Sequence, residues 1–134
     1  MPARAELTGM PAGLAELPDW LEAAEGFPAV VEGLLRAQAA TIDGAWNSSV
    51  SLVAATLARH APATLLVVLA HPRSLDDWAT DILSFSGIHV SVFPAWDALP
   101  TADTVIDEIG GQRLRVLRQL ESDSRQDGSL WARP

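Results

Sequence analysis

The sequence contains neither cysteine nor lysine, so all nine of its basic residues are arginines. Without cysteine the chain has no disulfide, no thiolate nucleophile and no thiolate metal ligand. Its 17 acidic residues leave a net charge of −8 at pH 7, which repels a phosphate backbone and disfavours nonspecific binding of nucleic acid. No apolar run approaches the roughly 18 residues of a membrane span, and the N-terminus lacks a signal-peptide core. We therefore expect a soluble, cytoplasmic protein.

Apolar runs alternate along the chain with segments of helical spacing. The 134 residues are 49% hydrophobic, enough for one buried core. Short β-like runs predict strands at 39–42, 64–70 and 88–93, and the helical pattern predicts helices around 18–21, 28–35, 52–57, 75–86 and 105–120. Two glycines, Gly110 and Gly111, leave room for a bend or an early break in the last helix. The alternation predicts an α/β fold, a three-layer parallel sheet with helical crossovers.

The predicted domain is bounded by two less regular segments. We expect a flexible leader at 1–13, one α/β domain at 14–121, and a linker or disordered tail at 122–134. A parallel sheet of about three strands has edges that are normally covered. The domain is therefore expected to dock against further polypeptide.

The residues from Gly44 to Leu52 occupy the place of a phosphate-binding loop, between a β-like run and a helix. A P-loop, G-x-x-x-x-G-K-[ST], surrounds phosphates with backbone N–H groups, neutralises them with lysine and holds magnesium with a hydroxyl. Counted from Gly44, Ser49 replaces the second glycine, Val50 replaces the lysine, and only Ser51 fits. Residual anion binding by Ser48, Ser49 and Ser51 is one interpretation, but a structural turn with a capping serine is favoured. We expect a vestigial loop without a cofactor.

Other candidate sites are weaker. The acidic residues between 76 and 108 fit solvated faces better than a metal site, and the isolated histidines at 60, 71 and 89 lack zinc-binding spacing, so we assign no metal and no catalytic residue. Trp96 lies in a connection with prolines at both ends and is either pinned under the sheet or displayed to a partner. Arg113, Arg115 and Arg118 form a basic stripe, for which ion pairing is favoured over DNA binding, with partner contact as the alternative. The candidate interface residues are Trp96, Asp97 and Arg113.

Several of these segments together resemble the N-terminal domain of bacterial transcription-repair coupling factors, the Mfd family. The most specific match is Phe93-Pro94-Ala95-Trp96-Asp97-Ala98-Leu99-Pro100, which is similar to the family's W-[DE]-x-L-P signature. The degenerate loop, the helix at 52–60, the apolar run at 65–72 and the helices at 75–85 and 109–120 are also similar to segments of that domain. The related protein UvrB has an intact P-loop, so the coupling factors fit better. The resemblance implies a degenerate P-loop NTPase-like fold, like domain 1a of UvrB.

The resemblance also implies a role. Family members displace stalled RNA polymerase with an ATP-driven DNA translocase of the helicase family and recruit UvrA through a UvrB-like module. This chain resembles the first, noncatalytic part of that module. ATP and magnesium would then serve a motor elsewhere, and RNA polymerase and DNA would contact other domains. The partners implied for this domain are the rest of its own polypeptide and, through the adjacent module, UvrA.

Two other functions are compatible with the residues. The chain can be a divergent P-loop nucleotide-binding enzyme that uses Ser51 and an arginine in place of lysine. It can also be a free-standing adaptor. Calorimetry with ATP and magnesium separates the enzyme from the scaffold, because only the enzyme binds nucleotide.

Overall fold

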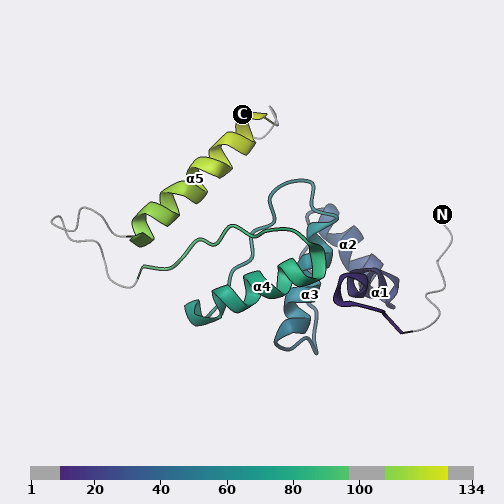
Figure 1. Cartoon of the computed structure of the whole chain (residues 1–134). Helices are drawn as coiled ribbons and strands as arrows, with labels where there is room; N and C mark the ends of the chain where they lie inside the picture. The colour runs from purple at the N-terminus through teal and green to yellow at the C-terminus, as the bar shows by residue number, and fades with distance from the viewer. Residues whose placement is uncertain (1–9, 97–107, 127–134) are drawn as a thin grey trace.

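A computed structural model describes residues 10–96 and 108–126 of the chain. Within these ranges it forms five α-helices and two short 3-10 helices. In chain order these are η1 (Leu14–Glu16), α1 (Leu17–Ala23), α2 (Phe27–Leu35), α3 (Ser48–Ala58), η2 (Pro72–Ser74), α4 (Leu75–Ser86) and α5 (Glu108–Gln126). Figure 1 shows α1 to α4 gathered into one group and α5 lying apart from them.

The prediction of a three-layer parallel sheet is wrong, because the described residues contain no strand. Segments 39–42, 64–70 and 88–93 are irregular, and none of their backbone groups hydrogen-bonds to another backbone group in the described ranges. A strand requires such a neighbour. The apolar runs indicated burial on both faces, yet Leu66 is 79% exposed and Val68 is 82% exposed. Nothing in the described chain covers these side chains. The segment has the amino-acid composition of a central strand, but in the described ranges it has no neighbouring strands and no covering helices.

The predicted helices are confirmed at five places. In α4 the apolar residues Leu75, Trp78, Ile82 and Phe85 recur at helical spacing, and Gly87 ends the helix with a positive φ of 69°. That backbone conformation favours glycine over residues with a Cβ. The last helix, α5, continues through Gly110 and Gly111 without a break and runs to Gln126, beyond the predicted end at residue 120. None of the helices in the described part of the chain is long and apolar enough to cross a membrane.

The core lies where α3 packs against α4. Ala55 of α3 is completely buried against Ile82 and Phe85 of α4. A small residue at this position lets the two helices approach closely. The partly buried residues Leu17, Leu52, Ala54 and Trp78 surround this cluster. The helical group therefore has a small core, centred on one helix pair.

An ion cluster ties α1 to the C-terminal end of α3. Arg59 Nη1 lies 2.8 Å from Asp19 Oδ1 and 3.2 Å from Glu22 Oε1, and His60 Nε2 lies 3.1 Å from the same Glu22 oxygen. The hydrogen bond to Asp19 raises the pKa of Arg59 above its ordinary value, and the charge of Glu22 acts in the same direction. Basic residues at the end of a helix also interact favourably with its dipole. These contacts connect residues about forty positions apart in the chain.

Substitution of Arg59 by methionine is expected to lower the free energy of unfolding by about 0.5–1 kcal/mol, since these part-exposed pairs are screened by solvent. Methionine keeps an apolar stem of similar length. Arg36→Met is the matched control, because within the described ranges Arg36 pairs with Glu32 alone, one turn away on the surface of α2. This substitution is expected to cost about 0.3 kcal/mol. Urea unfolding followed by circular dichroism measures both. Equal losses for the two variants would contradict a tertiary role for the Arg59 cluster.

Candidate functional site

The loop before α3 is closed by its own residues. Gly44 has a φ of 79°, and Asn47, the residue before the helix, has a φ of 47°. The Ser49 hydroxyl accepts a hydrogen bond from the Trp46 N–H at 2.6 Å and donates one to the Trp46 carbonyl at 2.8 Å. The Ser49 and Val50 N–H groups bond to the carbonyls of Trp46 and Asn47. Both the hydroxyl and these N–H groups are therefore engaged within the loop, where a P-loop would direct them to phosphate.

Ser51 is separated from solvent. Its side chain is completely buried, and its Oγ has no hydrogen-bond partner among the residues that the structure describes. The buried hydroxyl of Thr56, by contrast, donates to the Leu52 carbonyl at 2.8 Å. Ser48 is exposed on the first turn of α3. The structure thus places Gly44, Ser48 and Ser49 at the surface and Ser51 in the interior, and it does not gather the serines around one phosphate-sized space.

Arg113 is the candidate interface residue with the best-defined surroundings. Its guanidinium carbon lies 3.8 Å from the centroid of the Phe93 ring and 4.9 Å from that of the Trp96 ring. The same side chain donates a hydrogen bond to the Pro94 carbonyl. Stacking of a guanidinium on aromatic faces is a favourable cation–π arrangement. Sequence reasoning favoured ion pairing for this residue and missed the stacking, while Asp97 lies outside the described residues.

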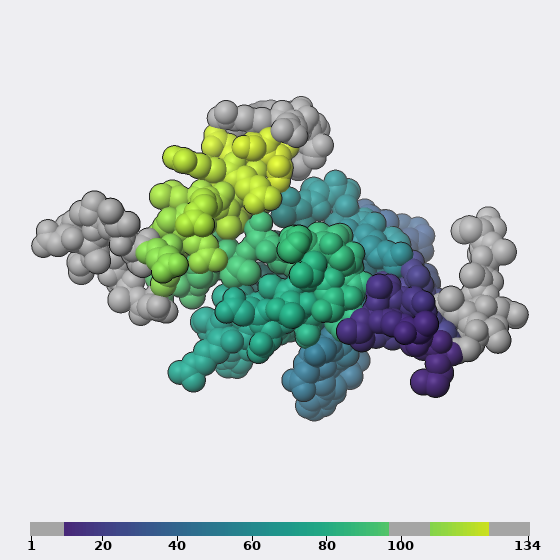
Figure 2. All heavy atoms as spheres, viewed as in Figure 1, coloured from purple at the N-terminus to yellow at the C-terminus, as the bar shows by residue number. Residues whose placement is uncertain are grey.

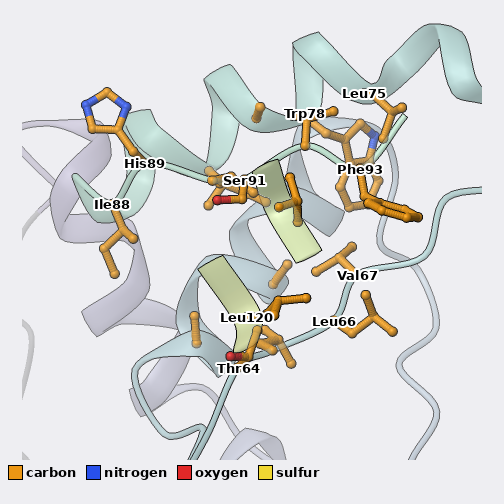
Figure 3. Close-up of a pocket in the computed structure, with 18 of the residues that line it drawn as sticks. Thr64, Leu66, Val67, Leu75, Trp78, Ile88, His89, Ser91, Phe93 and Leu120 are labelled. Carbon is orange, nitrogen blue, oxygen red and sulfur yellow. The ribbon is translucent and has the colours of Figure 1, made fainter. Parts of the chain in front are cut away.

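An open apolar cavity of about 680 Å³ lies beside this contact (Figure 3). Five elements line it: the irregular segments 64–69 and 88–93 and the helices α3, α4 and α5. Leu75 and Trp78 come from α4, Leu66 and Val67 from the first segment, and Leu120 from α5. We call the two irregular segments, 64–69 and 88–93, the apolar surface. Large side chains of both, including Leu65, Leu66, Val67, Val68, Ile88, Val90 and Phe93, are exposed.

Comparison with known proteins finds two similar proteins, and both have the same name. The chain is 35% identical over 79 residues to proteins named transcription-repair-coupling factor from Mycobacterium bovis and Mycobacterium tuberculosis. The aligned part covers 58% of this chain and 6% of each relative. This chain is related to the transcription-repair-coupling factors. No protein-family profile matches the chain, and no solved structure does.

This similarity confirms the resemblance to the coupling-factor family that the sequence indicated. The positions of the histidines and of the cavity are known from the structure alone. In the described ranges no group of three or more histidine, cysteine or acidic side chains is placed to hold a metal ion. His60 contacts Glu22 in the ion cluster, and His89 lies at the rim of the cavity (Figure 3). The cavity itself was missed because its residues were assigned to covered strands. The uninterrupted apolar run at 64–70 was the signal that could have indicated an exposed apolar surface.

Removal of the Ser51 hydroxyl by substitution with alanine is expected to raise the free energy of unfolding by about 1 kcal/mol, because a buried hydroxyl without a partner is costly. Thr56→Val is the control, since it removes a hydroxyl that is hydrogen-bonded and should lower stability by about 1 kcal/mol. Thermal unfolding at fixed concentration compares the two. A loss of stability in Ser51→Ala would show that the hydroxyl makes a stabilising contact.

Proposed function

We propose that this chain is a noncatalytic scaffold domain of a transcription-repair-coupling factor, part of the UvrB-like module that recruits UvrA in transcription-coupled nucleotide excision repair. In this proposal RNA polymerase and DNA contact other domains, ATP and magnesium serve a motor elsewhere in the protein, and the protein acts in the cytoplasm. The observation that carries the proposal is the exposed apolar surface in a chain related to one small part of a large protein.

The occupant we assign to the apolar surface is further polypeptide of the same factor. The chain spans about 6% of the length of the relatives it matches, so most of such a protein lies outside it. The backbone groups of 64–70 have no backbone partner among the described residues, and the side chains around them are aliphatic. Exposed aliphatic surface of this kind is stabilised by burial at about 25 cal/mol per Å². Docking would satisfy both the backbone groups and the side chains.

The loop geometry supports a noncatalytic role. A triphosphate needs a cation, free N–H groups and a hydroxyl at the magnesium. Here Val50 stands at the lysine position, Ser49 is bonded to Trp46, and Ser51 is buried. These residues do not fit ATP and magnesium.

Isothermal calorimetry of the chain with ATP and magnesium is expected to show no saturable heat up to about 1 mM nucleotide. Any binding free energy would then be weaker than about −4 kcal/mol. The quantity measured is the dissociation constant, and Trp46 fluorescence, from an indole that is exposed beside the loop, provides a second readout. Binding in the micromolar range that is weakened by Ser51→Ala would favour the divergent P-loop enzyme instead.

Recruitment of UvrA is tested in a chimera. The aligned segment of the Mycobacterium tuberculosis factor is replaced by the corresponding residues of this chain, and UvrA is captured on the purified chimera. We expect UvrA capture at the level of the unmodified factor, because a scaffold needs to preserve only its fold and its docking surface. A folded chimera that fails to capture UvrA would contradict the recruitment role.

A further inference from the structure

Helix α5 is attached to the rest of the molecule by its N-terminal half. Residues 109–113 and Val116 are half-buried, whereas every residue from 117 to 123 is exposed. The main helix–helix contacts of the described chain are those of α3 with α4 and of α1 with α3, and α5 takes part in none of them. In Figure 2, α5 lies at one side of the molecule. A helix that lies outside the main helix–helix contacts of the described chain and has an exposed C-terminal half is expected to open more readily than α3 or α4.

The side chain of Arg113 makes the best-defined contacts of this attachment. Arg113 contacts the rings of Phe93 and Trp96 and the carbonyl of Pro94. A second, weaker contact lies further along the helix, where the Ser91 hydroxyl donates to Gln119 Oε1 at 3.0 Å. The order of these contacts shows that α5 runs antiparallel to residues 91–96. Arg113 therefore fixes one end of α5 against the segment that borders the apolar cavity.

The other end of α5 lies over that cavity. Val116, Leu117 and Leu120 line it together with Leu66, Val67 and Trp78. We infer that α5 is a movable element that partly covers the apolar cavity and that Arg113 is the latch that holds α5 in this position. Opening would uncover more of the surface formed by 64–69 and 88–93. A role for this opening in docking rests on the proposed function, but the opening itself is a property of the chain alone.

The absence of native cysteine allows a direct test of the latch. A single Val116→Cys substitution places a thiol on the half-buried, cavity-lining face of α5, and its rate of reaction with a thiol reagent reports how often α5 opens. Addition of Arg113→Ala is expected to increase this rate by about tenfold, because it removes the cation–π stacking and the hydrogen bond that hold α5 in place. Arg113→Lys keeps the charge without the planar stack and is expected to give an intermediate rate.

Two other single-cysteine variants make the outcome decisive. Leu114→Cys lies at an exposed position of the same helix and should react rapidly whether or not Arg113 is present. Ser51 is completely buried, so the thiol of Ser51→Cys reacts only on global unfolding. Its reaction rate should not change with Arg113→Ala. Arg118→Ala removes an exposed arginine from the same helix and should leave the Val116→Cys rate unchanged. An unchanged rate at Val116→Cys on removal of Arg113, or an equal increase at Ser51→Cys, would overturn the latch. Neither result depends on UvrA or on docking.

Discussion

Replacement of Phe85 by alanine is expected to lower the free energy of unfolding by about 3–5 kcal/mol, because it removes a large ring from a packed interior and leaves a cavity. Phe85 is 7% exposed and belongs to the cluster of Ala55 and Ile82 between α3 and α4. Natural domains have a total stability of about 5–15 kcal/mol, and this core is small. We expect the variant to be largely unfolded at 37 °C, as measured by urea titration with far-ultraviolet circular dichroism.

Phe93→Ala is the matched control for that prediction. Phe93 has the same side chain, but it lies on the apolar surface and is 40% exposed. Its removal loses the stacking on Arg113 and only part of the burial, so the cost should be about 1 kcal/mol. If both variants lost the same stability, the core would not be centred on the α3–α4 pair.

The helices could be predicted from local sequence because their signals are local. The spacing of Leu75, Trp78, Ile82 and Phe85 is complete within α4, and Gly87 supplies the left-handed residue that ends it. The cap and the amphipathic face are contained in one short segment. Helix α5 continues through Gly110 and Gly111 without a break, since the cost of glycine in a helix is a preference of about 1 kcal/mol per residue. The proposed domain boundaries at 14 and 121 stay predictions.

The sheet could not be predicted in the same way because a strand depends on its neighbours. The run at 64–70 has the aliphatic composition of a buried strand, but its hydrogen bonds and its cover must come from other segments. In the described chain they do not. Composition identified the apolar residues, but it could not show whether another segment covers them.

The candidate site was predicted in part. The sequence indicated that the loop at 44–51 lacks the charge for phosphate, and the structure adds that Ser49 is bonded to Trp46 and Ser51 is buried. It also placed Trp96 and Arg113 among the interface candidates without predicting that they touch. That contact joins α5 to a segment about twenty residues earlier, and such a pairing depends on tertiary structure. The basic stripe of α5 was read as a surface pattern, and Arg113 instead has an aromatic partner.

The double substitution Leu66→Asp and Val68→Asp is expected to have opposite consequences in two contexts. In the isolated chain both residues are almost fully exposed, so the free energy of unfolding should change by less than about 0.5 kcal/mol. In the chimera with the Mycobacterium tuberculosis factor, docking would bury two carboxylates against aliphatic residues without partners. That should destabilise the docked arrangement by about 3–5 kcal/mol, which is roughly a hundredfold or more in the docking equilibrium.

The measurement is the protease sensitivity of the domain boundary in the purified chimera, together with UvrA capture. Leu35→Asp provides the matched control, since Leu35 is an exposed leucine on α2 outside the apolar surface, and it should leave both readouts unchanged. A chimera that tolerates aspartate at positions 66 and 68 would show that the apolar surface remains in water there. Because the loop at 44–51 is untouched by these substitutions, such a result would remove the docking assignment while leaving the absence of nucleotide binding to be decided by calorimetry. Sensitivity confined to positions 66 and 68 would instead identify this surface as the contact through which a small helical domain becomes part of a much larger protein.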